Sequence, residues 1–387
     1  MDILKYDAAA GCILLLAAAL ALVVSNSGLA DHYDALQDRQ ITLGLAPLVL
    51  SKTVLHWVND GLMALFFFVV ALEIKRELVD GALASWRQAA LPAIAAVGGM
   101  AVPALVYVVF NRGGGDALNG WAIASATDIA FAVGVLALLG RRVPVALRVF
   151  LLSLAIIDDL GAIVIIALFY TAQLSPLALA LAGLGLLALV GLNRWHVTAW
   201  VAYLTVGAFV WLCVLKSGVH ATLAGVATGL AVPLTGASKA APSPLESMKH
   251  ALEPWVNFLI LPLFAFLNAG VSFAGIGLAT VLMPVPLGIA LGLFVGKQVG
   301  IFGAAWLAVK AGLASLPEKV TWRQLYGTAI LGGIGFTMSL FLGTIAFDHE
   351  RYAAAIRIGV LAGSVVSGVV GYLWLRRVLP PVPITGT

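Results

Sequence analysis

Apolar residues follow one another along this chain in long stretches that are separated by short polar connections. A helix needs roughly 20 apolar residues to cross a hydrocarbon core of about 30 Å, and about twelve stretches are long enough. We place them at residues 8–25, 54–74, 90–110, 118–139, 146–171, 175–192, 197–215, 218–235, 252–272, 284–309, 323–346 and 353–376. The pattern predicts an all-α membrane protein with about 12 transmembrane helices.

The composition agrees with that pattern. Of the 387 residues, 62% are hydrophobic and only 10% are charged, which is far more apolar than a soluble domain of this length. Most connections are short and contain no long Pro- or Ser-rich linker, so we expect a single integral membrane domain over residues 1–387. Cys12 and Cys213 both fall inside predicted spans, where a disulfide framework or a metal cluster is not expected.

The basic residues predict an orientation. Positive charge is retained in cytoplasmic loops, and with both termini inside, fifteen Lys and Arg residues fall in cytoplasmic segments and five in periplasmic ones. We therefore expect a multi-pass protein of the bacterial inner membrane with both termini cytoplasmic. The basic charges are dispersed over many loops, so they indicate no nucleic-acid partner.

Four charges interrupt the apolar spans near mid-depth. Asp158 lies ten residues beyond Arg148, or about 15 Å into its span at the helical rise of about 1.5 Å per residue. Asp128, Asp159 and Lys297 lie at similar depths in theirs. Charges at this depth face the bundle interior or water and mark functional sites. The alternative is a set of static ion pairs that hold helices together, but three acids meet only one base here.

The adjacent carboxylates suggest a chemistry. Neighbouring helical residues point about 100° apart, so one of Asp158 and Asp159 can pair with Lys297 while the other lines a water-filled cavity. Desolvation and like-charge repulsion favour the protonated form, and the ionised oxygens, together with the Thr127 hydroxyl, suit a hard cation such as Na⁺ or Li⁺. Competition between protons and cations at one site, combined with alternating access, is sufficient for an antiporter.

Two segments predict interrupted helices. "SATDIAFAVG" (125–134) and "GGIGFTMSLFLG" (332–343) place small and Thr-containing sequence in the middle of spans 4 and 11. Spans 3–5 and 10–12 start on opposite sides of the membrane, as inverted repeats must. We expect spans 4 and 11 to cross, with Asp128 and Lys297 neutralising the helix ends at the centre. The alternative is that these glycines only allow close helix packing.

Long motifs carry a resemblance to a known family. "ATDIAFAVGVLALLG", "LAIIDDLGAIVIIALFY", "LKSGVHATLAG", "LPLFAFLNAGVS" and "GGIGFTMSLF" resemble the NhaA family of bacterial Na⁺/H⁺ antiporters over essentially the whole chain. The resemblance implies a transporter domain without a cofactor that exchanges Na⁺ or Li⁺ for more than one proton, electrogenically and under pH control. It implies that Asp159 is the main cation ligand, that Asp158 pairs with Lys297 when no cation is bound, and that Thr127 and Asp128 belong to the interrupted fourth helix.

The residues of the family's pH-responsive region match this sequence less closely. The candidate residues are Glu73, Arg76, Glu77, His220, Glu246, Lys249, His250 and Glu253. Glu246 stands where the family often has a base, Lys249 where it often has an acid, and Glu253 where a histidine is familiar. A swapped charge pair is one interpretation of this difference, and a solvated cytoplasmic face is the other.

The expected partners are Na⁺ or Li⁺, protons, the lipid bilayer, and a second copy of the chain through residues 26–53. Two other protein classes fit part of this pattern. An intramembrane aspartyl protease also uses two midplane aspartates, but the chain lacks the G-x-G-D segment of that family, so we expect no enzyme. A sodium-coupled symporter needs only the cation site, whereas the Asp158, Asp159 and Lys297 group favours proton exchange.

Overall fold

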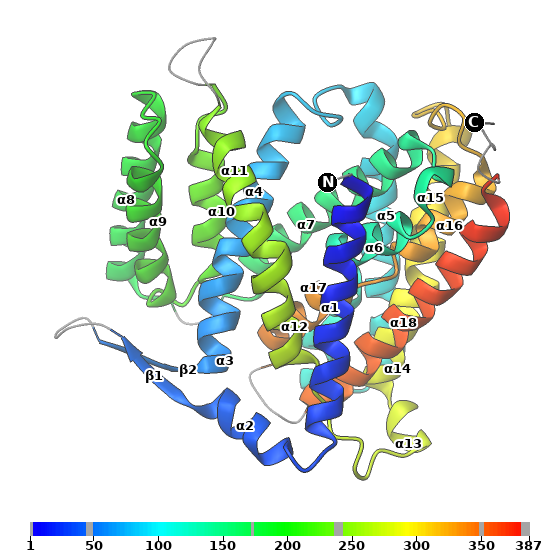
Figure 1. Cartoon of the computed structure of the whole chain (residues 1–387), viewed down its shortest axis with the longest axis horizontal. Helices are drawn as coiled ribbons and strands as arrows, with labels where there is room; N and C mark the ends of the chain where they lie inside the picture. The colour runs from blue at the N-terminus through cyan, green and yellow to red at the C-terminus, as the bar shows by residue number, and fades with distance from the viewer. Residues whose placement is uncertain (1–2, 44–48, 172–173, 236–242, 348–351, 381–387) are drawn as a thin grey trace. The chain divides into compact units, whose positions relative to one another are not determined.

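The computed structural model describes residues 3–43, 49–171, 174–235, 243–347 and 352–380. Its contacts divide the chain into two compact units (Figure 1). The first unit comprises Met1–Leu22, Ala82–Ala162 and Ala269–Thr387, and the second comprises Val23–Gly81 and Ile163–Asn268. The single domain over residues 1–387 stays a prediction.

The first unit contains the two helices that are broken in mid-span. Its long helices are α1 (Ile3–Ser25, as far as Leu22), α5 (Trp86–Phe110), α7 (Val145–Phe169, as far as Ala162), α15 (Lys297–Lys310) and α18 (Ala353–Val378). One broken pair is the 3₁₀ helix η2 (Gly115–Ser125) with α6 (Ile129–Ala137), and the other is α16 (Trp322–Leu331) with α17 (Phe336–Ala346). The remaining elements are η3 (Gly140–Arg142), α13 (Leu278–Val281), α14 (Pro284–Leu291) and the π-helical segment η5 (Gly292–Gly296).

The second unit combines helices with a small hairpin. Its helices are α2 (Ala30–Asp38), α3 (Val54–His56), α4 (Met63–Val79), α8 (Pro176–Arg194), α9 (Trp200–Leu215), α10 (Thr222–Ala231), α11 (Pro244–Trp255) and α12 (Leu261–Ala269), with π-helical segments η1 (Trp57–Leu62) and η4 (Val256–Ile260). Strands β1 (Gln40–Leu43) and β2 (Leu50–Thr53) pair antiparallel, with Gln40 opposite Thr53. The hairpin lies inside the segment that we expect to mediate dimerisation, of which residues 44–48 lie outside the described residues.

The structure supports the prediction of membrane-spanning helices, but it does not test the number of about 12. Over the described residues, seven helices are long and apolar enough to cross a membrane, or up to nine if each bent pair is one span. The pairs η2–α6 and α16–α17 bend by 41° and 45°, at the breaks expected in spans 4 and 11. Two further apolar helices, α9 and α10, are shorter. The chain is therefore a helical membrane protein with interrupted helices.

Glycines bring the backbones of α5 and α15 into contact in the first unit. A Cβ added to Gly98 or Gly300 would overlap the carbonyl group of the other residue, and one at Gly99 would lie 2.7 Å from Ile301 Cγ1 and 3.8 Å from Lys297 Cδ. These contacts need residues without side chains. Because α15 begins at Lys297, the close packing fixes the position of the lysine that carries the buried positive charge.

Glycines have the same function between α4 and α10 in the second unit. A Cβ at Gly229 would lie 2.6 Å from Phe68 O and 2.8 Å from Ala71 Cβ. At the end of α10, Lys75 Nζ donates hydrogen bonds to Leu230 O at 2.8 Å and to Val232 O at 2.6 Å. A cation at a helix C-terminus is favourable, although burial lowers the pKa of Lys75.

Gly229→Ala is expected to lower the thermal stability of the purified protein. The added methyl group has no space between α10 and α4, and overpacking of this kind costs about 1–3 kcal/mol. Gly183→Ala in α8 is the matched control, since a Cβ there meets nothing within 4 Å. Thermal unfolding in detergent measures both variants, and equal midpoints for the two would contradict the packing.

Candidate functional site

The two broken helices contact each other at their breaks. Between η2 and α6, the Asp128 amide donates a hydrogen bond to Ile334 O at 2.7 Å. The Thr127 hydroxyl lies 2.8 Å from Gly332 O. Both acceptors belong to the break between α16 and α17. Unwound backbone is tolerated at membrane depth only where protein or a cavity satisfies it, and here each break supplies partners to the other.

Asp128 accepts hydrogen bonds from the first turns of two helices. Its Oδ1 accepts a hydrogen bond from the Phe131 amide at 2.9 Å, so that it caps α6. Its Oδ2 accepts one from the Thr337 amide at 3.0 Å and a short one from the Thr337 hydroxyl, at the start of α17. A carboxylate is favourable at a helix N-terminus. Asp128 therefore balances the positive ends of both α6 and α17.

Two residues of this junction were missed by the sequence analysis. Thr337 lies within the quoted "GGIGFTMSLFLG" segment, but its contact with Asp128 depends on how the two breaks face each other. Ser364 lies on α18 and accepts hydrogen bonds from the amides of Gly335 at 3.2 Å and Phe336 at 3.1 Å. A serine within an apolar helix was the available signal for Ser364, since its hydroxyl needs a buried partner.

The buried lysine pairs with one of the two adjacent aspartates. Lys297 Nζ lies 2.5 Å from Asp158 Oδ2 and 2.9 Å from Thr127 Oγ1. Thr127 Oγ1 in turn lies 2.7 Å from the same Asp158 oxygen. The side chains of Lys297 and Asp158 are fully buried. Asp158 and Lys297 are therefore in contact, and the Thr127 hydroxyl bridges them.

The hydrogen bonds of Lys297 among the described residues go to the side chains of Asp158 and Thr127. Its neutralisation of the carbonyl ends of the broken helices stays a prediction. The wider turn of the π-helical segment η5 ends immediately before Lys297. Such segments often occur at functional sites because they change the direction of the following side chain.

Asp159 is the exceptional group of the site. It is 0% exposed, and neither carboxylate oxygen has a hydrogen-bond partner among the described residues. Asp158 Oδ1 is also unpaired. Electrostatic interactions link Asp159 to Asp158, Asp128 and Lys297. A buried carboxylate without partners is costly unless it is protonated or binds a cation, so Asp159 has the properties of a residue that exchanges one for the other.

The available donors suit a small hard cation. They comprise the unpaired oxygens of Asp158 and Asp159, the Thr127 hydroxyl and the backbone carbonyls at the break. Carboxylate, hydroxyl and carbonyl oxygens bind hard cations. In the described part of the chain, no group of three or more His, Cys, Asp or Glu side chains is placed to hold a metal ion.

Comparison with known proteins identifies the family. The sequence profile described as "Na+/H+ antiporter 1" matches residues 1–375. The chain is 56% identical to proteins named Na(+)/H(+) antiporter NhaA from Rhodospirillum rubrum, over 97% of this chain and 96% of the relative, and from Aeromonas hydrophila, over 97% and 95%. The chain belongs to the NhaA family of Na⁺/H⁺ antiporters. Its relatives are transporters, so the expectation of a transporter that is not an enzyme is confirmed.

The residues expected in the pH-responsive region of NhaA proteins separate into two places. Arg76 Nη2 lies 2.9 Å from Glu73 Oε1 and 2.7 Å from Glu77 Oε1, and Lys249 forms a short ion pair with Glu73. Glu246 interacts electrostatically with Arg76, and these carboxylates together raise the pKa of Arg76. The network joins α4 to α11.

The structure places His220 away from this network. His220 Nδ1 lies 2.8 Å from Thr222 Oγ1 at the start of α10, whereas Lys75 binds the other end of the same helix. Ten residues of α10 span about 15 Å. His250 is exposed and Glu253 half-buried on α11. The structure thus brings Glu73, Arg76, Glu77 and Lys249 together and leaves His220 apart.

Asp128→Ala is expected to destabilise the protein more than Thr337→Val. The first change leaves the part-buried amide of Phe131 and the buried amide of Thr337 without their carboxylate acceptor, at about 1–3 kcal/mol for each buried group left unsatisfied. The second removes only the hydroxyl donor. Thermal unfolding in detergent measures the order, with Thr344→Val, whose hydroxyl bonds only to its own helix, as the control. An Asp128→Ala variant as stable as the control would contradict the double-capping function.

Proposed function

We propose that the chain is an electrogenic Na⁺(Li⁺)/H⁺ antiporter that exports sodium in exchange for protons by alternating access. The observation that carries this proposal is the fully buried Asp159 carboxylate, whose two oxygens are unpaired beside the Asp158–Lys297 ion pair. Membership of the NhaA family supports exchange of Na⁺ and protons. The residues that bind them in this chain are part of our proposal.

Competition at Asp159 couples the two ions. With no cation bound, protonation removes the charge of Asp159, whose burial is otherwise unfavourable. Na⁺ or Li⁺ binding provides the charge balance in another way, and the proton must leave before the cation can use both oxygens. Because one carboxylate holds either ion but not both, each change of access carries one or the other. Asp158 and Thr127 provide the further oxygen ligands.

The Asp158–Lys297 pair supplies the electrogenic step. In the cation-free state the buried pair is neutral overall, with Lys297 carrying its proton. When a cation recruits the Asp158 oxygens, Lys297 loses its counter-charge, and an unpaired buried ammonium is strongly disfavoured. The lysine then releases a proton as well. Two protons therefore leave for each bound Na⁺. The proton-loaded and the Na⁺-loaded states of the site differ in charge, so the membrane potential acts on the transport cycle.

The architecture that we propose is the one predicted from the sequence. About 12 spans form one domain over residues 1–387, with inverted repeats in spans 3–5 and 10–12, and with spans 4 and 11 crossing at their breaks. The contacts between the two breaks and the shared carboxylate of Asp128 support the crossing. We place the chain in the bacterial inner membrane with both termini cytoplasmic, and a homodimer through residues 26–53 belongs to the proposal.

We also propose that the network on α4 and α11 sets the pH response. The ion pair between Glu73 and Lys249 links the two helices in spite of the altered charge pattern at residues 246–253. Lys249 therefore supplies, from α11, a positive charge facing the acids of α4. His220, His250, Glu246 and Glu253 stay candidates for the same response.

Asp159→Asn is expected to abolish cation-dependent proton movement. The amide has no charge to balance Na⁺ or Li⁺ and no proton to exchange at neutral pH. The measurement is the fluorescence of a pH-sensitive dye in acidified everted vesicles from antiporter-deficient cells, with Na⁺, Li⁺ or K⁺ added at several pH values. The wild-type protein should dequench the dye with Na⁺ and Li⁺.

The matched control is Asp116→Asn, which changes an exposed carboxylate of η2. It should keep the wild-type response. Wild-type vesicles that respond to no cation at any pH, although the protein is in the membrane, would contradict the antiporter. Solute uptake that requires Na⁺ and leaves the pH gradient intact would instead favour a symporter.

The double variant Asp158→Asn with Lys297→Gln is expected to keep some exchange but to move less net charge. Both members of the buried pair become neutral, so neither is left unpaired, and Asp159 alone exchanges one proton for one cation. Potential-sensitive dye or electrode currents on a supported membrane measure the charge movement. Asp7→Asn with Arg148→Gln removes another ion pair of the same unit and should leave the current unchanged. Wild-type charge movement in the first double variant would contradict the electrogenic function of the pair.

A further inference from the structure

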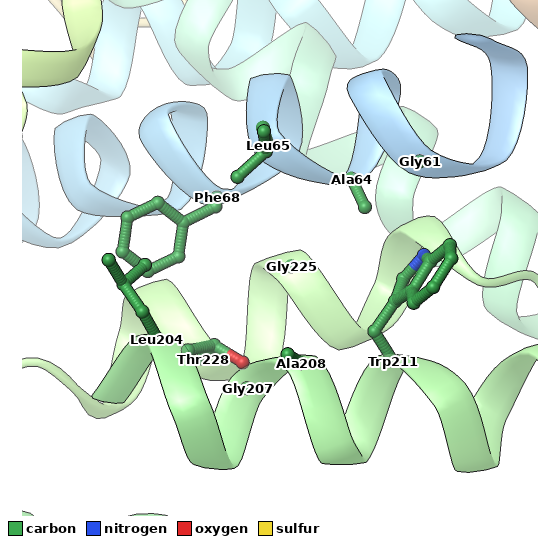
Figure 2. Close-up of a pocket in the computed structure, with 10 residues that line it drawn as sticks. All are labelled: Gly61, Ala64, Leu65, Phe68, Leu204, Gly207, Ala208, Trp211, Gly225 and Thr228. Atoms are coloured by element: carbon green, nitrogen blue, oxygen red, sulfur yellow. The ribbon is translucent and has the colours of Figure 1, made fainter. Parts of the chain in front are cut away.

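A cavity of about 210 Å³ lies within the second unit, whereas the residues of the ion site belong to the first (Figure 2). Its walls come from η1 and α4 on one side and from α9 and α10 on the other. Small residues line it, among them Gly61 and Ala64 on the first wall and Gly207, Ala208 and Gly225 on the second. Gly207 and Gly225 let α10 pack closely beside the space, because a Cβ there would overlap Thr228 and the carbonyl oxygen of Ala64.

The two polar side chains among the described residues that line the cavity already donate hydrogen bonds within the protein. Its indole, Trp211, donates Nε1–H to Asp60 O at 3.0 Å, and its hydroxyl, Thr228, donates to Ala224 O at 2.7 Å. The rest of the lining is apolar or glycine. Apolar cavities of about 150 Å³ stay dry and bind apolar molecules, so an occupant of this cavity is a hydrocarbon.

The shape of the cavity fits an extended hydrocarbon chain. One wall runs from Gly61 to Phe68 and the other from Leu204 to Trp211, and seven helical steps correspond to about 10 Å. Figure 2 shows Phe68 and Leu204 at one end and Trp211 at the other. Leu65 and Leu204 on the rim are 40% and 38% exposed. The helices are apolar, so the medium that reaches this rim in a bilayer consists of acyl chains.

Positive charges lie beyond the Trp211 end. The Trp57 and Trp211 rings lie 6.2 Å apart, and tryptophans are enriched at the level of lipid headgroups. Lys52 on β2 lies shortly before Trp57 in the chain, and Lys216 follows Trp211 as the C-cap of α9. Asp60, which interacts with Lys52, offsets part of this charge. Lysines near the interface attract anionic headgroups.

We propose that this cavity binds one acyl chain of an anionic phospholipid, whose phosphate lies at Lys52 and Lys216. The acyl chain fills the space that α4, α9 and α10 line, and the headgroup reaches the end of the cavity near Lys52 and Lys216. This site is separate from the proposed exchange of ions, and its tests do not use transport as their readout.

The first test counts lipids on the full-length protein. Native mass spectrometry of the purified wild-type protein with added phosphatidylglycerol should show one retained lipid that Ala208→Phe loses. Excluding about two methylene groups from the cavity should lower the bound fraction about tenfold. Ala180→Phe, at an exposed position of α8, is the control for added bulk and should retain the lipid. Equal retention by all three proteins would overturn the proposal.

The second test examines the headgroup end and the position of the acyl chain. Lys52→Gln with Lys216→Gln should lower retention of phosphatidylglycerol but not of phosphatidylcholine, and an equal loss of both would overturn the assignment of the phosphate. In vesicles of phosphatidylglycerol with brominated acyl chains, the difference in fluorescence between wild type and Trp211→Phe isolates the Trp211 emission. This emission should be strongly quenched, and an unquenched Trp211 would also overturn the proposal.

Discussion

The structure depends on the unfavourable free energy of burying charge without an opposite charge. Three carboxylates and one ammonium group occupy the interior of the first unit, and all four are almost fully buried. Lys297 can balance only one of them at 2.5 Å. Asp128 is stabilised by backbone amides at two helix N-termini. Asp159 pairs with neither an opposite charge nor an amide donor among the described residues, and in our proposal a transported cation or a proton balances its charge.

The broken helices follow from the same constraint. A continuous helix has its amides paired internally, so it offers few donors to a carboxylate in mid-membrane. The break before α17 exposes the amides of Gly335, Phe336 and Thr337. Ser364 accepts from the first two and Asp128 from the third. In "GGIGFTMSLFLG", Gly332, Gly333 and Gly335 therefore lie in an interruption, whereas Gly343 lies within α17 and packs against Ile356. A Cβ at Gly333 would also overlap Leu293 O, so interruption and close packing occur together there.

Much of this arrangement could be predicted from one sequence because depth along a helix is a one-dimensional quantity. Residue counting places Asp158 and Lys297 at the same depth, and their different signs suggest the contact. The positions of apolar helices follow from hydropathy in the same way, although α10 covers only ten residues of the span expected at 218–235. Thr337 and Ser364 could not be assigned because their functions depend on which helices are neighbours in space. Similarly, the separation of His220 from Glu73 depends on packing that spacing does not encode.

The charges at residues 246–253 are complementary to those of α4, although their order differs from the one that the resemblance implies. Lys249 forms an ion pair with Glu73, and Glu246 lies close enough to Arg76 to interact with it. The acids of α4 therefore keep a positive partner on α11, and the positive residue of α4 keeps a negative one. What α11 presents to α4 is a set of complementary charges rather than a fixed order of residues. A link of this kind tolerates exchange of an acid and a base along α11, because the interaction energy depends on the sign and distance of the charges.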